Sequence, residues 1–88
     1  DYMFNIDDVK RVSKILSIKF DKFTPLDLLN GMNIELEHGL VNPETNVSND
    51  DLVITAKIAL AHLNEFPNYY NSIYGIKTFE DYLRSKLK

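Results

Sequence analysis

Both histidines of the chain stand three residues from a glutamate, Glu35 with His38 and His62 with Glu65. On a helix, residues at this spacing lie one turn apart on the same flank. A carboxylate and an imidazole held in this way can bind one metal ion, and two such helices facing each other would supply two nitrogens and two oxygens. That donor set suits zinc, iron or manganese. One hypothesis is therefore a divalent-metal site formed by Glu35, His38, His62 and Glu65.

The same four residues allow two other interpretations. A buried, hydrogen-bonded His–Glu network that holds two helices together is the leading one, and solvated surface pairs are the third. A complete di-iron site needs further glutamates, and the only nearby carboxylates are Asp50 and Asp51. The sequence therefore disfavours a di-iron centre and leaves the other readings open.

Composition narrows the classes of protein and of function. Eighty-eight residues make one domain over residues 1–88, and 44% hydrophobic with 26% charged residues favours a folded chain. The absence of cysteine excludes disulfides and thiolate metal sites. The net charge of −3, without a basic stripe, argues against nucleic-acid binding. No apolar run is long enough to span a membrane, so we expect a cytoplasmic protein.

Signals for enzymatic catalysis are weak. The serines lack the context of a nucleophile elbow, and three glycines form no phosphate-binding loop. The sequence therefore favours a protein that is not an enzyme.

The elements that must position these side chains are helices. Thr24 and Pro25 are typical of a helix start, Gly39 of a helix end, and Pro67 stops a helix near Phe66. The third helix is expected to begin near Asp51, with Ser48, Asn49 or Asp50 as its cap, and Thr78 is expected to cap the last one. The fold class predicted is all-α, a compact bundle or orthogonal array of four to five short helices. The expected helices cover residues 6–17, 25–38 and 51–66 and a last amphipathic segment after Thr78, with a helical turn at 68–74.

Apolar spacing predicts which side chains face the core. The residues expected to point inward are Val9, Val12, Leu16 and Ile15; Leu28, Leu29, Met32 and Leu36; Leu52, Ala56, Ala59, Leu60 and Leu63; and Phe79, Tyr82, Leu83 and Leu87.

Two local features leave alternatives open. Gly31 lies inside a helix at a cost of about 1 kcal/mol relative to alanine, so it marks either the close approach of another backbone or a surface imperfection. Phe66, Tyr69, Tyr70 and Tyr74 either form an aromatic contact patch for a partner or close the end of the core, and we favour the second reading.

Residues 20–70 resemble a small helical domain family of unknown function found in bacteria, phages and large DNA viruses. The resemblance is carried by the segments ELEHGL at 35–40, NVSNDD at 46–51 and KIALAHLNEFPNYY at 57–70. Ser48 stands where threonine is expected, and Asn68 where aspartate is expected. The family carries no established activity. The resemblance implies one recurring constellation, made of Glu35, Glu37, His38, Asn49, Asp50, His62, Asn64 and Glu65.

The leading functional hypothesis is a small helical binding or assembly module with a His/Glu cluster between its two central helices. A protein partner or self-association is expected, without nucleic acid or membrane. The first alternative is a metal-binding domain for zinc, iron or manganese, which would also allow hydrolytic chemistry. The second, which the viral members of the similar family suggest, is a structural component associated with a virus particle, so that the chain would lie in a virion.

Overall fold

Four helices make up the described part of the chain. The computed structural model describes residues 3–41 and 52–87, and the side chains of residues 3–37 and 52–87. The helices are α1 (Ile6–Leu16), α2 (Pro25–Val41), α3 (Leu52–Glu65) and α4 (Ile76–Ser85). No strand occurs in these residues, and none of their helices is long and apolar enough to cross a bilayer. The prediction of an all-α array is confirmed.

α1 begins at a reciprocal capping pair. The backbone N–H of Asn5 donates to Oδ2 of Asp8 at 2.8 Å, and the N–H of Asp8 donates to Oδ1 of Asn5 at 3.0 Å. These bonds satisfy two donors that a helix start would otherwise leave free. Ser17 ends α1 in the left-handed conformation at a φ of 53°. The expected range of 6–17 is therefore met to within one residue, because α1 runs from Ile6 to Leu16 and Ser17 is its C-cap.

α2 begins with the same device and ends later than expected. Thr24 and Asp27 exchange backbone and side-chain hydrogen bonds of 2.9 and 3.1 Å, and Pro25 opens the helix as predicted. The expected stop at Gly39 is wrong, because α2 continues to Val41. No glycine in the described residues has a positive φ, so Gly39 keeps a helical backbone and lacks the left-handed conformation that closes a helix.

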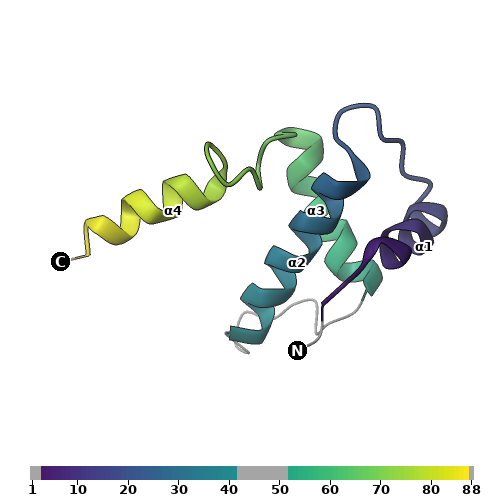
Figure 1. Cartoon of the computed structure of the whole chain (residues 1–88), viewed down its shortest axis with the longest axis horizontal. Coiled ribbons are helices and arrows are strands. Elements are labelled where there is room, and N and C mark those ends of the chain that lie inside the picture. The colour runs from purple at the N-terminus through teal and green to yellow at the C-terminus, as the bar shows by residue number, and fades with distance from the viewer. Residues whose placement is uncertain (1–2, 42–51, 88) are drawn as a thin grey trace.

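α1, α2 and α3 form the base of the molecule. α2 crosses and packs against α3, and α1 packs against both (Figure 1). Asn33 of α2 also holds the residue before α1, because its amide accepts from the N–H of Phe4 at 2.8 Å and donates to the carbonyl of Phe4 at 3.2 Å. The core consists of Phe4, Val9, Val12, Phe23, Leu28, Met32, Leu36, Ala56, Ala59, Leu63 and Tyr70.

Apolar spacing predicted the inward faces of these three helices well, with one exception. Ile15 is 61% exposed, because Val9, Val12 and Leu16 already form the stripe that meets α2 and α3. The prediction for the start of the third helix lies outside the described residues, as do its candidate caps and the carboxylates considered for a di-iron site. These residues are Ser48, Asn49, Asp50 and Asp51.

α4 departs from the expected bundle. It begins at Ile76 with Gly75 as its N-cap, so the predicted cap at Thr78 is wrong. The hydroxyl of Thr78 donates to the carbonyl of Ile73 at 2.6 Å and caps no N–H group. No Cα atom of α4 lies within 8 Å of a Cα atom of α1, α2 or α3, and α4 extends away from the base (Figure 1).

The predicted inward face of the last helix is correspondingly wrong. No residue of α4 is buried. The exposed fractions are 57% for Phe79, 58% for Tyr82, 46% for Leu83 and 83% for Leu87. An amphipathic pattern requires only that one face avoids water, and among the described residues no other helix lies near enough to cover that face.

Candidate functional site

Glu35 of α2 and His62 of α3 approach each other where the two helices meet. Nε2 of His62 lies 3.9 Å from Oε2 of Glu35, and the side chains are 36% and 16% exposed, respectively. This separation exceeds a hydrogen bond. One member of each His/Glu motif therefore lies at the α2–α3 contact without a direct bond between them.

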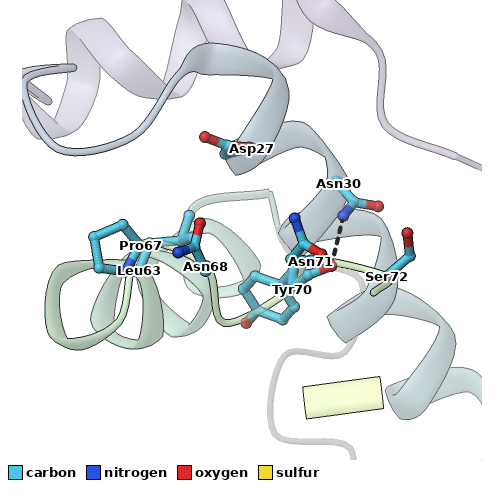
Figure 2. A pocket seen from close by; sticks show the side chains of 8 residues that line it. All are labelled: Asp27, Asn30, Leu63, Pro67, Asn68, Tyr70, Asn71 and Ser72. Carbon is cyan, nitrogen blue, oxygen red and sulfur yellow. Dashed lines mark hydrogen bonds between the residues drawn. The ribbon is translucent and has the colours of Figure 1, made fainter. Parts of the chain in front are cut away.

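Tyr70 supplies the hydrogen bond that Glu35 makes. Its hydroxyl donates to Oε2 of Glu35 at 2.6 Å, and its backbone carbonyl accepts from Nδ2 of Asn30 at 3.1 Å, the dashed line in Figure 2. Burial raises the pKa of the Tyr70 hydroxyl above its ordinary value, and the bond to Glu35 raises it further. Tyr70 is therefore protonated at neutral pH and acts as a donor to the carboxylate.

Gly31 makes room for the ring of Tyr70. A Cβ atom at this position would lie 2.5 Å from Cε2 and 2.6 Å from Cδ2 of that ring, whereas carbon atoms pack at about 3.5–4.0 Å. Gly31 is also buried. Both interpretations of this glycine from the sequence are wrong, because it marks the approach of a side chain instead of a backbone or a surface imperfection.

Three rings complete the group around Glu35. Tyr69 stacks on His62 with ring centroids 4.2 Å apart and planes 5° apart. Tyr70 meets both rings edge-on, at 6.1 Å from His62 and 4.9 Å from Tyr69. Burial raises the pKa of Tyr69, and the negative charge of Glu35 raises it further. We call Glu35, His62, Tyr69 and Tyr70 the polar–aromatic cluster.

The polar–aromatic cluster joins three segments of the chain. Glu35 comes from α2, His62 from α3, and the two tyrosines from the turn that follows α3. A hydrogen bond to a charged group contributes about 1.5–3 kcal/mol, and an aromatic pair about 0.5–1.5 kcal/mol beyond the area it buries. These contacts hold the turn after α3 against α2, which is the arrangement expected of a structural network.

The structure describes the side chains of three of the four predicted metal ligands. Glu65 is exposed, and the side chain of His38 lies outside the described residues. Within the described part of the chain, no three His, Cys, Asp or Glu side chains gather to hold a metal ion. Because one of the four predicted ligands is outside that part, the site of Glu35, His38, His62 and Glu65 stays a prediction.

Sequence reasoning did not find Tyr70 as the partner of Glu35. The signal that pointed to it was the position of Gly31, four residues before Glu35 on the same flank of α2. A glycine inside a helix, one turn from a mostly buried carboxylate, is a place where an aromatic ring can enter and bond that carboxylate.

A small pocket lies beside the polar–aromatic cluster, between α2 and the turn (Figure 2). Its volume of 200 Å³ is below the range of about 300–1,000 Å³ that is typical of small-molecule sites. Two of its amides already bond the backbone, because Asn30 donates to Tyr70 and Asn71 accepts from Ile73 and Tyr74. These two amides thus hold the turn. The pocket is lined by Asp27, Asn30, Leu63, Pro67, Asn68, Tyr70, Asn71 and Ser72.

The second candidate site is the surface of α4. We call Phe79, Tyr82 and Leu83, together with Leu87 two residues beyond the end of the helix, the α4 apolar face. The other side of the helix carries charges that pair within it. Arg84 donates to Asp81 at 2.8 Å, and Lys77 donates to the same carboxylate at 3.2 Å. The polar side of α4 is therefore satisfied within the helix, whereas its apolar face lies in solvent.

A groove of 350 Å³ continues this face toward the base of the molecule. We call it the root groove. Of the four aromatic residues considered in the sequence, Tyr70 is buried and Tyr69 half-buried, so these two close the core. Phe66 and Tyr74 are 57% and 63% exposed and line the groove. The root groove is lined by Phe66, Asn68, Tyr69, Tyr74, Gly75, Ile76 and Phe79.

Comparison with known proteins places the chain in a family. The model of the family described as Protein of unknown function (DUF5661) matches residues 9–78, so the chain belongs to that family. No curated protein and no solved structure matches the chain. The match spans most of α1, all of α2 and α3 and the start of α4, and it includes every residue of the polar–aromatic cluster. The distribution among bacteria, phages and large DNA viruses stays a prediction.

Proposed function

We propose that this domain is a protein-interaction module, in which the base of α1, α2 and α3 presents α4 to a protein partner. The single observation that supports this function best is the exposure of the α4 apolar face, where Leu87 is 83% and Tyr82 58% exposed. Large apolar side chains gathered on one exposed surface are typical of an interaction site. Aromatic residues are also enriched at the centres of protein interfaces.

The turn before α4 supports the proposal, because it holds the helix away from the base. The N–H of Ile76 donates to the carbonyl of Tyr69 at 2.6 Å, and the N–H of Gly75 donates to that of Asn71 at 2.8 Å. A Cβ atom on Gly75 would lie 2.5 Å from both carbonyl oxygens. The chain therefore leaves the base through a hydrogen-bonded turn that only glycine fits, and α4 is directed by bonded contacts.

In this proposal the polar–aromatic cluster has a positioning role. Tyr69, whose carbonyl receives the bond from Ile76, stacks on His62. Tyr70, the next residue, is bonded to Glu35 and Asn30 of α2. The cluster thus connects the α2–α3 contact to the first residue of α4. This agrees with the leading hypothesis from the sequence, a binding module with a His/Glu cluster between its central helices.

The experiment is site-specific photo-crosslinking in the cells that naturally make the chain. A benzophenone amino acid replaces Phe79 on the α4 apolar face or, as a matched control, Lys77 on the polar side of the same helix. We expect protein adducts from position 79 and few from position 77, with adducts identified by mass spectrometry. Equal labelling from both positions, or no protein adduct from either, would refute the proposed function.

A further inference from the structure

We infer that the partner of α4 is a second copy of this chain, bound antiparallel about a two-fold axis near Tyr82. This inference rests on the proposed function and names the occupant of its surface. Four observations support it: the apolar area, the distribution of charge, the spacing of Glu80 and Arg84, and the position of the root groove.

The exposed apolar area matches what a dimer needs. Seven large side chains on α4 and near its root are between 46% and 83% exposed. At roughly 150–250 Å² for a large side chain, they present on the order of 900 Å² together. A stable interface buries about 800 Å² on each partner. The side chains are Phe66, Ile73, Tyr74, Phe79, Tyr82, Leu83 and Leu87.

The distribution of charge favours the antiparallel arrangement. Residues 1–75 hold eleven acidic and six basic residues, a net charge of −5, whereas residues 76–88 hold two acidic and four basic residues, a net charge of +2. A parallel pair would place the two negatively charged α1–α3 units side by side, so they would repel each other. An antiparallel pair separates the bases and brings the basic end of each α4 toward the acidic base of the other copy, so attraction replaces repulsion.

The order of charges along α4 is self-complementary in the same arrangement. Glu80 and Arg84 lie one turn apart on one flank of the helix, where their side chains approach to 3.9 Å. In an antiparallel pair centred near Tyr82, the same flanks meet, so Glu80 faces the partner's Arg84 and Arg84 faces the partner's Glu80. A two-fold interface requires this kind of reciprocal contact.

The root groove accepts the end of the partner helix. In an antiparallel pair centred on Tyr82, positions at equal distances before and after the centre face each other, so Leu87 of one copy lies opposite Lys77 of the other, next to Ile76. Ile76 and Phe79 line the root groove. Leu87, the most exposed large apolar side chain of the described residues, would therefore enter an apolar groove at each end of the pair.

Sedimentation equilibrium over a range of concentrations tests self-association. The monomer mass is 10.2 kDa, and we expect twice that mass as the concentration rises. The double variant Phe79→Ser with Leu83→Ser should raise the dimer Kd by more than about tenfold, whereas the matched control Lys77→Ser should leave it within about twofold. Neither variant touches a buried residue, so the helical circular dichroism and melting of the base should stay the same.

Single cysteines test the orientation, because the natural chain has none. Leu83→Cys lies near the proposed axis and should form an intermolecular disulfide on oxidation. Leu87→Cys should not, because antiparallel copies separate the two positions by about 15 Å along the helices. Efficient bridging through Leu87→Cys would overturn the antiparallel pair.

Failure of this inference is separable from failure of the proposed function. A monomer at all concentrations, with photo-adducts from position 79 to a different protein, overturns the second copy and leaves the interaction module intact. A monomer without any adduct overturns both. A dimer that the double serine variant does not weaken overturns the assignment of α4 as its interface.

Discussion

Replacing Gly31 by alanine tests the packing that joins α2 to the turn before α4. Replacing a glycine in a helix interior by alanine usually stabilises the helix, by about 0.8–1.0 kcal/mol. Here the new Cβ atom would lie 2.5 Å from Cε2 of Tyr70. Because the ring is held by the bond to Glu35 and by edge-on contacts with His62 and Tyr69, it cannot move away without breaking those contacts.

The magnitude follows from two opposing effects. Overpacking a well-filled site costs typically 1–3 kcal/mol, and loss of the Tyr70–Glu35 hydrogen bond adds to that cost if the ring swings out. Set against the gain in helix propensity, the net expectation for Gly31→Ala is a loss of about 1–2 kcal/mol. For a domain of this size, the melting temperature should fall by roughly 4–16 °C.

Urea unfolding followed by circular dichroism measures the change. The decisive control repeats the substitution in a Tyr70→Val background, which lacks Cδ2, Cε2 and Cζ of the ring. There Gly31→Ala should be neutral or stabilising, so the effect of the same substitution changes sign. An increase in stability from Gly31→Ala in the natural background would refute the reasoning, because it would mean that the Tyr70 ring does not occupy the space over Gly31.

The remaining predictions concern pH and metal. The pKa of Tyr70 in the folded protein is raised above its ordinary value near 10, so as the pH rises the unfolded chain loses this proton before the folded protein does. The contribution of Tyr70 to the free energy of unfolding is therefore fully present below about pH 10. Above that pH it should fall by up to about 1.4 kcal/mol per pH unit. Tyr70→Phe should lower the free energy of unfolding at pH 7 by about 1–3 kcal/mol and reduce that slope, as urea titrations between pH 7 and 12 would measure. If the polar–aromatic cluster is purely structural, equimolar zinc should leave the melting temperature unchanged. A rise that His62→Gln abolishes would instead support the metal site of Glu35, His38, His62 and Glu65.

Local signals in the sequence predicted much of the base. Thr24 and Pro25 marked the start of α2 because a capping oxygen and a fixed φ act on the residues next to them. The apolar stripe of α3 predicted its buried side chains, including Ala56 and Leu63, because a helix repeats its face every 3.6 residues. The end of α2 was not predicted correctly from Gly39, because a glycine permits a helix to end without requiring it to end.

The candidate site was predictable only in part. The spacing of Glu35 and His62 within their motifs suggested that each lies on a helix flank, and both do lie at the α2–α3 contact. The partner that Glu35 bonds is Tyr70, at a sequence distance of thirty-five residues. No periodic pattern connects positions so far apart, so the bond is decided by how α2, α3 and the turn pack.

The sequence by itself determined that the chain forms helices and that its last helix has one apolar face, because both properties are local. Only the tertiary structure decided where that face lies. Gly75 and the bond from Ile76 to Tyr69 direct α4 away from the base, so Phe79 and Leu87 are exposed instead of inward. An amphipathic pattern indicates that one face of a helix has to be covered by another surface. The path of the backbone decides whether that surface can come from the same molecule.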